Sequence, residues 1–185
     1  HLLIEQTKKY KPDTICILNE RKKNALETAL ANTKVKIISG RSALLELSKR
    51  NDIDLMMNAL VGSSGMEPTI EALKAQVDVA LSNKESLVMA GHIINQIIEK
   101  NSVNLFPVDS EHSAIWQCLI GEKKEQINKI ILTGSGGPFR QKPIEDFNKI
   151  KLEDALKHPN WEMGNKITID SASMMNKGLE VIEAH

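Results

Sequence analysis

Two short acidic segments could together hold a hard divalent cation. Asp109 and Glu111 are two residues apart in PVDSEH, a segment expected to be extended, so both carboxylates would lie on one face. Asn176 and Glu180 are four apart in MMNKGLE, with Lys177 between them, so a helix places amide, ammonium and carboxylate on one side. Carboxylate oxygens favour Mg²⁺ or Mn²⁺, whereas zinc prefers Cys or His. Solvated acids at a strand end and an ordinary surface helix are the alternatives, because the sequence alone does not show convergence.

A second set of side chains has the chemistry of a phosphate site. Ser135 lies between two glycines in TGSGGPFR, directly after an apolar run, where backbone N–H groups and a hydroxyl can approach an anion closely. Ser171 adds a second hydroxyl, and Asn176 and Lys177 add an amide and a positive charge. Such donors suit a phosphate monoester. A plain linker is the alternative for this loop.

The segment HPNWEMG is a polar loop with unusual members. Trp161 is either an apolar anchor for that loop or part of a lid that folds over a ligand and excludes water. His158, next to a proline, is by its type more often a surface residue than a catalytic one. His112, beside the acidic pair, could cap a helix or touch a ligand.

The first part of the chain alternates short β-branched runs with amphipathic stretches. This alternation predicts a parallel sheet with helices on both faces, a Rossmann-like α/β domain. The expected strands are 14–18, 35–39, 54–61 and 77–82, and the expected helices are 20–31, 40–50, 67–76 and 84–100. Ligands in such folds bind beyond the carboxyl ends of the strands, which singles out the loops 61–65 and 82–85. A tight strand-to-helix turn is the plainer interpretation of VGSSG at 61–65.

The regular alternation of apolar runs and amphipathic stretches ends after residue 107. This change predicts two domains, 1–107 and 108–185. The second domain is expected to be α+β, with strands at 127–135 and 166–171, a helical stretch at 143–157 and a final helix. No G-x-G-x-x-G motif is present, so a dinucleotide fingerprint would have to lie outside this chain.

The composition excludes several classes of protein. The 185 residues carry 24 basic and 24 acidic side chains, a balance that argues against binding nucleic acid or anionic membranes through bulk charge. Aromatic residues make up only 3%, too few for base-stacking surfaces, and no apolar run is long enough for a membrane span. Cys16 and Cys118 lack metal or redox spacing and are expected to be reduced core residues.

Both ends of the sequence indicate an internal fragment of a longer polypeptide. The chain starts at His1 and enters an amphipathic run at once, and it stops while SMMNKGLEVIEAH is still in helical period.

Four motifs, in order along nearly the whole chain, resemble one family. They are ALSNKESLV (80–88), LFPVDSEHSAIWQ (105–117), ILTGSGGPFR (131–140) and HPNWEMGNKITIDSASMMNKGLEVIEA (158–184). The chain is similar to the 1-deoxy-D-xylulose 5-phosphate reductoisomerases, enzymes of non-mevalonate isoprenoid synthesis that depend on NADPH and a divalent metal. Compared with the family, the chain lacks the N-terminal glycine-rich NADPH loop and the C-terminal helical domain.

The resemblance implies a role for particular residues. The metal carboxylates would be Asp109, Glu111 and Glu180. The substrate-binding residues would be Lys84, Ser110, Glu111, Ser135, His158, Ser171, Asn176, Lys177 and Glu180, and those that carry catalysis Glu180, Lys177, His158 and Trp161. The residues lining the cofactor would be Asn83, Glu85, Met163 and Gly164, with Trp161 and Met163 in a flexible flap.

The implied reaction converts 1-deoxy-D-xylulose 5-phosphate into 2-C-methyl-D-erythritol 4-phosphate, with NADPH and Mg²⁺ or Mn²⁺ (or Co²⁺) as cofactors. The resemblance also implies a homodimer and a location in a bacterial cytoplasm or a plastid-like compartment. Two other hypotheses are a phosphosugar- and metal-binding module without turnover, and a metal-dependent phosphatase that uses the same carboxylates.

Overall fold

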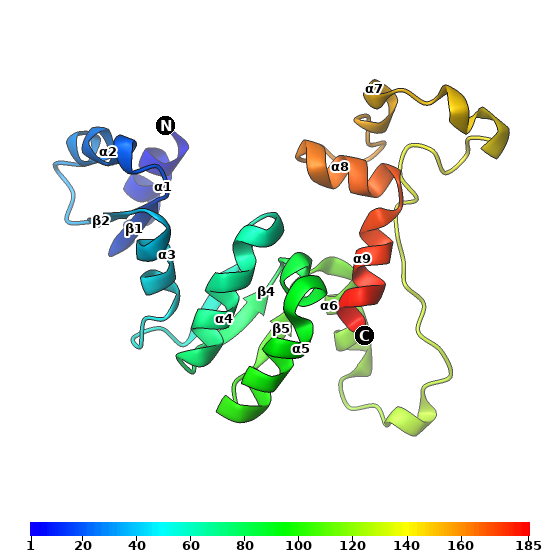
Figure 1. Ribbon diagram of the computed structural model, residues 1–185, viewed down its shortest axis with the longest axis horizontal. Helices are drawn as coiled ribbons and strands as arrows, with labels where there is room; N and C mark the ends of the chain where they lie inside the picture. The colour runs from blue at the N-terminus through cyan, green and yellow to red at the C-terminus, as the bar shows by residue number, and fades with distance from the viewer.

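The fold is built on two parallel sheets, shown in Figure 1 by a computed structural model that describes all residues from 1 to 185. Strands β1 (Thr14–Ile17) and β2 (Lys36–Ser39) form the first sheet. Strands β3 (Leu55–Asn58), β4 (Asp78–Leu81) and β5 (Leu105–Pro107) form the second, with β4 in the centre. All neighbouring strands run parallel, which confirms the expected α/β class.

Helices connect and cover these strands. In order, they are α1 (Leu2–Tyr10), α2 (Lys23–Ala29), α3 (Arg41–Ser48), α4 (Met66–Lys74) and α5 (Lys84–Asn101). Short 3-10 turns precede α2 (Glu20–Lys22) and α4 (Gly62–Gly65). The amphipathic patterns correctly predicted α2, α3, α4 and α5, because each has one apolar face to bury against a strand.

The main core lies between β4 and the helices α4 and α5. Leu73, Val79 and Ile94 are fully buried there, and Leu81 is almost so. A second, smaller core joins β1 to α2 through Ile15, Leu26 and Leu30. It is separate from the main core. Because β4 is buried on both faces, its run of apolar residues has no polar alternation.

The second half of the chain is helical and wraps back onto the first. Its elements are α6 (Ser110–Leu119), 3-10 turns at Lys124–Gln126 and Ile144–Lys149, α7 (Leu152–Ala155), α8 (Asn165–Ala172) and α9 (Met175–Ala184). Helix α9 packs against α5, so the end of the chain returns to the N-terminal half, and a long extended connection runs between α6 and α7 (Figure 1). No helix has the length and apolar character needed to cross a membrane.

Two strands expected in this half are wrong. Residues 166–171 are helical in α8, because Thr168 and Ala172, four apart, form its buried face, and the alternating isoleucines only imitate a strand. Residues 127–133 pair with no other strand, and Ile130 and Ile131 are 59% and 68% exposed. An apolar run forms a strand only where a neighbouring strand accepts its hydrogen bonds.

Two smaller expectations also need correction. The stretch 143–157 is not one helix, since a 3-10 turn and the single-turn α7 are separated at Ile150 and Lys151. Cys118 is exposed on α6 rather than in the core, whereas Cys16 is half-buried in β1.

A carboxylate and hydroxyl site at the carboxyl edge of the sheet

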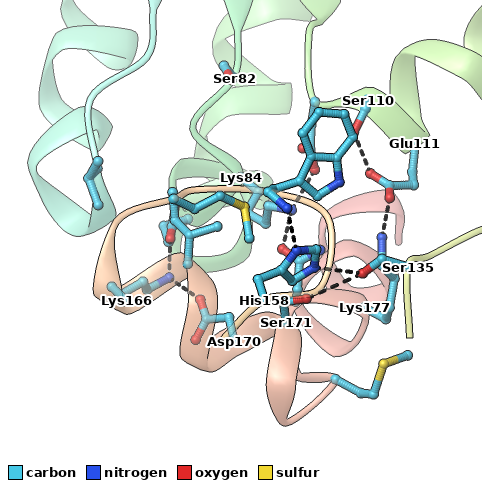
Figure 2. Close-up of a pocket in the computed structure, with 18 of the residues that line it drawn as sticks. Ser82, Lys84, Ser110, Glu111, Ser135, His158, Lys166, Asp170, Ser171 and Lys177 are labelled. Carbon is cyan, nitrogen blue, oxygen red and sulfur yellow. Dashed lines mark hydrogen bonds and ion pairs between the residues drawn. The ribbon is translucent and has the colours of Figure 1, made fainter. Parts of the chain in front are cut away.

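A cavity of about 500 Å³ opens beyond the carboxyl ends of β3, β4 and β5. The loop after β3 supplies Ala59, Leu60 and Val61, and the loop after β4 supplies Ser82. The remaining wall comes from α5, α6, the Ser135 loop, the 158–163 loop, α8 and α9. Figure 2 shows side chains from these distant segments pointing into one space.

The structure brings most of the expected site residues to this cavity. Those that line it are Lys84, Glu85, Asp109, Ser110, Glu111, Ser135, His158, Trp161, Met163, Ser171, Asn176 and Lys177. Glu180 lies directly beneath it, with no exposed surface. Gly164 and Asn83 do not line the cavity.

The carboxylates of Asp109 and Glu111, which line the cavity, meet that of Glu180 beneath it. One oxygen from each lies within 4.8 Å of the others. Asp109 and Glu111 are not on an extended segment as expected, because Asp109 is the N-cap of α6 and Glu111 lies in its first turn. Acidic side chains at a helix N-terminus face the partial positive charge of free N–H groups, which favours the helix over a strand here.

Two lysines are paired with these carboxylates. Lys84 Nζ lies 2.6 Å from Asp109 Oδ2 and 2.9 Å from Glu180 Oε1. Lys177 Nζ contacts Glu111 and lies 2.9 Å from Glu180 Oε2. Burial opposes the charged form of Lys84, but Asp109 and Glu180 outweigh it and raise the pKa of the ammonium above its ordinary value.

Glu111 is held in its charged form by the same pairing. Burial opposes ionisation of this carboxyl, yet the hydrogen bonds from Lys177 and Ser110 outweigh burial and lower its pKa. Ser110 Oγ donates to Glu111 Oε2 at 2.8 Å, so the hydroxyl also fixes the orientation of the carboxylate. Glu111 therefore presents ionised oxygen atoms to the site.

His112 joins α6 to α9 behind the carboxylates. Its Nε2 lies 3.1 Å from the backbone oxygen of Glu180, and its Nδ1 lies 3.2 Å from Glu183 Oε2. Burial, with the nearby Asp109 carboxylate, raises the pKa of Glu183 to about 7. This histidine is neither a helix cap nor exposed to the cavity, and its contacts hold together the two helices that carry Glu111 and Glu180.

Ser135, Ser171 and His158 form a compact group of donors on another wall. Ser135 Oγ lies 3.1 Å from His158 Nε2 and 3.5 Å from Ser171 Oγ (Figure 2). The Nδ1 atom of His158 accepts backbone N–H bonds from Asn160 and Trp161, at 3.2 and 3.0 Å. Because Nδ1 accepts, the neutral ring carries its proton on Nε2 and donates toward Ser135.

The histidine contacts also shape the loop that carries Trp161. Trp161 is 65% exposed at the mouth of the cavity and packs into no core. An indole that is both exposed and part of a cavity wall fits a lid better than an anchor.

Glu85 and α8 meet at the rim of the cavity, away from the serine hydroxyls. Lys166 of α8 pairs with Glu85 of α5 and lies 2.7 Å from Asp170 Oδ2 (Figure 2). Burial opposes ionisation of Glu85, but Lys166 outweighs it and lowers the pKa of the carboxyl. Sequence reasoning missed Lys166 and Asp170 because their i, i+4 spacing is visible only once 166–171 is interpreted as a helix.

Asn83, expected to contact the cofactor, is instead enclosed by protein. Its side chain is the N-cap of α5, accepting from Ser86 N at 3.0 Å, and its amide donates to the carbonyls of Leu60 and Gly62. It is 2% exposed, and a Cβ added to Gly65 would lie 2.6 Å from it. Asn83 therefore positions the loop after β3 rather than facing the cavity.

We expect Asn83→Ala to lower the free energy of unfolding by about 3 kcal/mol, because it removes a helix cap and leaves buried carbonyl groups without a hydrogen-bond donor. Chemical denaturation followed by circular dichroism measures this loss. Asn24→Ala, at an exposed position of α2, is the control and should change stability by less than about 0.5 kcal/mol. An Asn83 variant of normal stability that fails to bind nucleotide would favour the cofactor contact instead.

The fold and the site define a class: α/β proteins that bind ligands at the carboxyl edge of a parallel sheet, here with a carboxylate cluster beside hydroxyl and ammonium groups. Residues 1–91 match the family model described as 1-deoxy-D-xylulose 5-phosphate reductoisomerase, and residues 105–185 match the model of that enzyme's C-terminal domain. The chain belongs to the 1-deoxy-D-xylulose 5-phosphate reductoisomerase family, which confirms the resemblance seen in its motifs.

Individual relatives agree with this assignment. A reductoisomerase of Chloroherpeton thalassium is 54% identical over 99% of this chain, and one of Lachnospira eligens is 53% identical over 98%. The chain spans about half the length of these relatives, 47% and 48% respectively.

Solved structures of the same enzyme have the same fold. A crystal structure of a DOX-P reductoisomerase in complex with NADPH, fosmidomycin and magnesium is similar to this chain with a TM-score of 0.88 and 38% identity, over 98% of this chain and 47% of the other. The Zymomonas mobilis enzyme in complex with NADPH gives a TM-score of 0.87 at 39% identity, over 98% of this chain and 46% of the other.

Proposed function

We propose that the complete protein carrying this chain converts 1-deoxy-D-xylulose 5-phosphate into 2-C-methyl-D-erythritol 4-phosphate, with NADPH and Mg²⁺ or Mn²⁺. The observation that carries the proposal is a cluster of three carboxylates, two lining the cavity and one buried beneath it, beside two serine hydroxyls and a lysine. The relatives named for this reaction support it, and none of those compared favours a phosphatase. We further propose that residues 1–107 serve the cofactor and 108–185 the metal and substrate.

The carboxylate cluster fits a divalent cation. All its donors are ionisable oxygens, the set that Mg²⁺ and Mn²⁺ prefer. Asp109 Oδ2 is buried and lies 2.6 Å from the Lys84 ammonium. A buried anionic oxygen is costly without a cation beside it, and a divalent ion would meet that need as the ammonium does here. Asp109, Glu111 and Glu180 would hold the metal.

The other end of the cavity fits the reactive ring of a nicotinamide. Leu60, Val61, Met163 and Ile167 give it an apolar wall, and Glu85 lies at the rim. Leu60 and Val61 follow the carboxyl end of β3, the edge of the sheet where nucleotides bind in doubly wound folds. When bound, the metal would supply Lewis-acid polarisation of the substrate carbonyl, and NADPH would supply hydride.

The side chains of this chain would perform binding, orientation and shielding. Ser135, Ser171, Asn176 and Lys177 would hold the phosphate and so fix the carbon skeleton. His158 would keep the Ser135 hydroxyl aimed at that anion through its Nε2–H. Trp161, at the mouth, would exclude water from the aldehyde that must form before reduction. The binding energy of the phosphate, which is remote from the reacting atoms, would be used to hold those atoms in position.

Oxidation of NADPH by the complete protein tests the proposal. We expect oxidation to require both 1-deoxy-D-xylulose 5-phosphate and a divalent metal, and phosphorus NMR to show one phosphate monoester replacing another. Release of inorganic phosphate without use of NADPH would contradict the proposal and favour a phosphatase. Metal and substrate binding without NADPH use would leave only a binding module.

The association state and the cell compartment are part of the same proposal. We propose a homodimer in a bacterial cytoplasm or plastid-like compartment, on the strength of the family resemblance. Light scattering on the complete protein distinguishes a dimer from a monomer.

A further inference from the structure

Both ammonium groups at the site lie on the oxygens that would bind a metal. Lys84 Nζ contacts Asp109 Oδ2 and Glu180 Oε1, and it donates a third hydrogen bond to Asn176 Oδ1 at 2.7 Å. Lys177 Nζ contacts Glu111 Oε1 and lies 3.0 and 2.9 Å from the two oxygens of Glu180. Every carboxylate of the cluster is therefore paired with a lysine.

These ion pairs and a metal compete for the same lone pairs. The three carboxylate oxygens that lie within 4.8 Å of one another would all turn toward a metal bound among them, and Lys84 and Lys177 now contact these same carboxylates. An ammonium in contact with these oxygens and a divalent ion bound by them would repel each other strongly in this buried environment. Lys84 and Lys177 are only 12% and 17% exposed, so solvent screens that repulsion little.

Lys177 lies between the carboxylates and the Ser135 loop. Its stem passes the start of that loop, since a Cβ added to Gly134 would lie 2.9 Å from Lys177 Cε. Both Ser135 and Lys177 line the same cavity (Figure 2). A lysine stem has four rotatable bonds, so a change of rotamer moves the ammonium from Glu111 toward the hydroxyls.

The net charge of the carboxylate and lysine cluster links metal binding to anion binding. Three carboxylates and two ammonium groups leave one net negative charge, which disfavours an incoming phosphate. Adding a divalent cation changes that balance to one net positive charge. Metal and anion would therefore favour each other, and such coupling is reciprocal by linkage.

We propose that Lys84 and Lys177 are resident counter-ions that a divalent metal displaces from the carboxylates, and that the displaced Lys177 then faces an anion at the Ser135 loop. The inference rests on the proposed metal site and goes beyond it, because it assigns the lysines a role before substrate is present. Metal binding thereby prepares the phosphate subsite.

The reactivity of the lysine amines tests the displacement without any variant. The complete wild-type protein is acetylated at trace level with and without Mg²⁺, in a buffer free of phosphate, and each lysine is quantified by mass spectrometry. We expect acetylation of Lys84 and Lys177 to rise several-fold with Mg²⁺, while exposed Lys123 stays constant. Unchanged or reduced acetylation at saturating Mg²⁺ would overturn the inference.

Calorimetric titration with Mg²⁺, in the presence and absence of inorganic phosphate, tests the coupling. We expect phosphate to tighten Mg²⁺ binding to the wild-type protein several-fold. Lys177→Met should bind Mg²⁺ more tightly than wild type and lose the effect of phosphate, whereas Lys177→Arg, which keeps the charge, should stay close to wild type. Weaker Mg²⁺ binding in Lys177→Met would overturn the inference.

The proposed metal site and the proposed counter-ion role of the lysines can be tested separately. Absence of Mg²⁺ binding to the wild-type protein would remove both the metal site and the inference. Normal Mg²⁺ binding together with unresponsive lysines would leave the proposed function standing and remove only the counter-ion role.

Discussion

Glu180→Gln should weaken Mn²⁺ binding by more than about 100-fold, because even the partners that merely orient metal ligands contribute 10- to 100-fold to affinity. Glu180 is fully buried and receives contacts from both lysines and from Asn176 Nδ2 at 2.7 Å. The amide keeps the shape of the side chain but removes its charge. Free Mn²⁺, measured by electron paramagnetic resonance during titration, gives the affinity directly.

The same substitution should leave the fold intact. In the variant, the two remaining carboxylates balance the two lysines, so no unpaired charge is left in the buried cluster. A cooperative thermal transition checks this point. Glu122→Gln, at an exposed position, is the matched control and should bind Mn²⁺ like the wild type. Equal Mn²⁺ affinity in Glu180→Gln would remove Glu180 from the metal site.

The sheet half of the fold could be predicted from sequence because its signals are local. Strands such as β4 are short apolar runs, and the helices between them have one apolar face each, so the order of elements follows from periodicity alone. The same reasoning failed at 166–171, where Ile167 and Ile169 alternate like a strand. The buried pair Thr168 and Ala172, which decides for a helix, becomes visible only with its neighbours in place.

The three clustered carboxylates show how a site can be found although its local structure is misjudged. Asp109 and Glu111 were expected on a strand face, yet they lie at the N-terminus of α6. A position at the start of a helix and a position on a strand face both direct these acids beyond the end of β5. Glu180 comes from α9, and only the packing of α9 on α5 brings it there.

Asn83 and Lys166 show what the sequence could not give. The motif ALSNKES marks Asn83 as important, but its burial against Leu60 and Gly62, more than twenty residues away, is a tertiary property. Lys166 pairs with Glu85 across 81 positions of the chain, and no local pattern links them. The residue types indicated the chemistry of the site. Which residues line the cavity and which only hold its walls in place depends on the tertiary structure.

The second large effect is expected at Gly137, which lies in the Ser135 loop in the left-handed region, with φ +64°. A Cβ there would lie 2.6 Å from the backbone oxygen of Ser171 and 3.1 Å from Ala172 Cα. These are backbone atoms of α8 and cannot rotate away. Gly137→Ala should therefore lower the free energy of unfolding by about 2–4 kcal/mol, about 1 from the conformation and the rest from overpacking.

The loop and the helix would have to separate to relieve that clash. Because Ser135 Oγ and Ser171 Oγ are 3.5 Å apart across this contact, a separation pulls apart the two hydroxyls proposed to hold the phosphate. We expect the KM for the phosphorylated substrate to rise about 100-fold or more, since small misplacements of binding groups have effects of that size. Steady-state kinetics on the complete protein measure it, and Mn²⁺ binding should stay close to wild type.

Substitutions at two other glycines distinguish the conformational cost of Gly137→Ala from the cost of its steric clash. Gly121 also has a positive φ, of +83°, but no atom lies within 4 Å of its added Cβ, so Gly121→Ala reports the conformational cost alone. Gly164 has open space and no positive φ, so Gly164→Ala should be nearly neutral for stability. A KM in Gly137→Ala no higher than in Gly121→Ala would show that the contact between the Ser135 loop and α8 does not set the phosphate site.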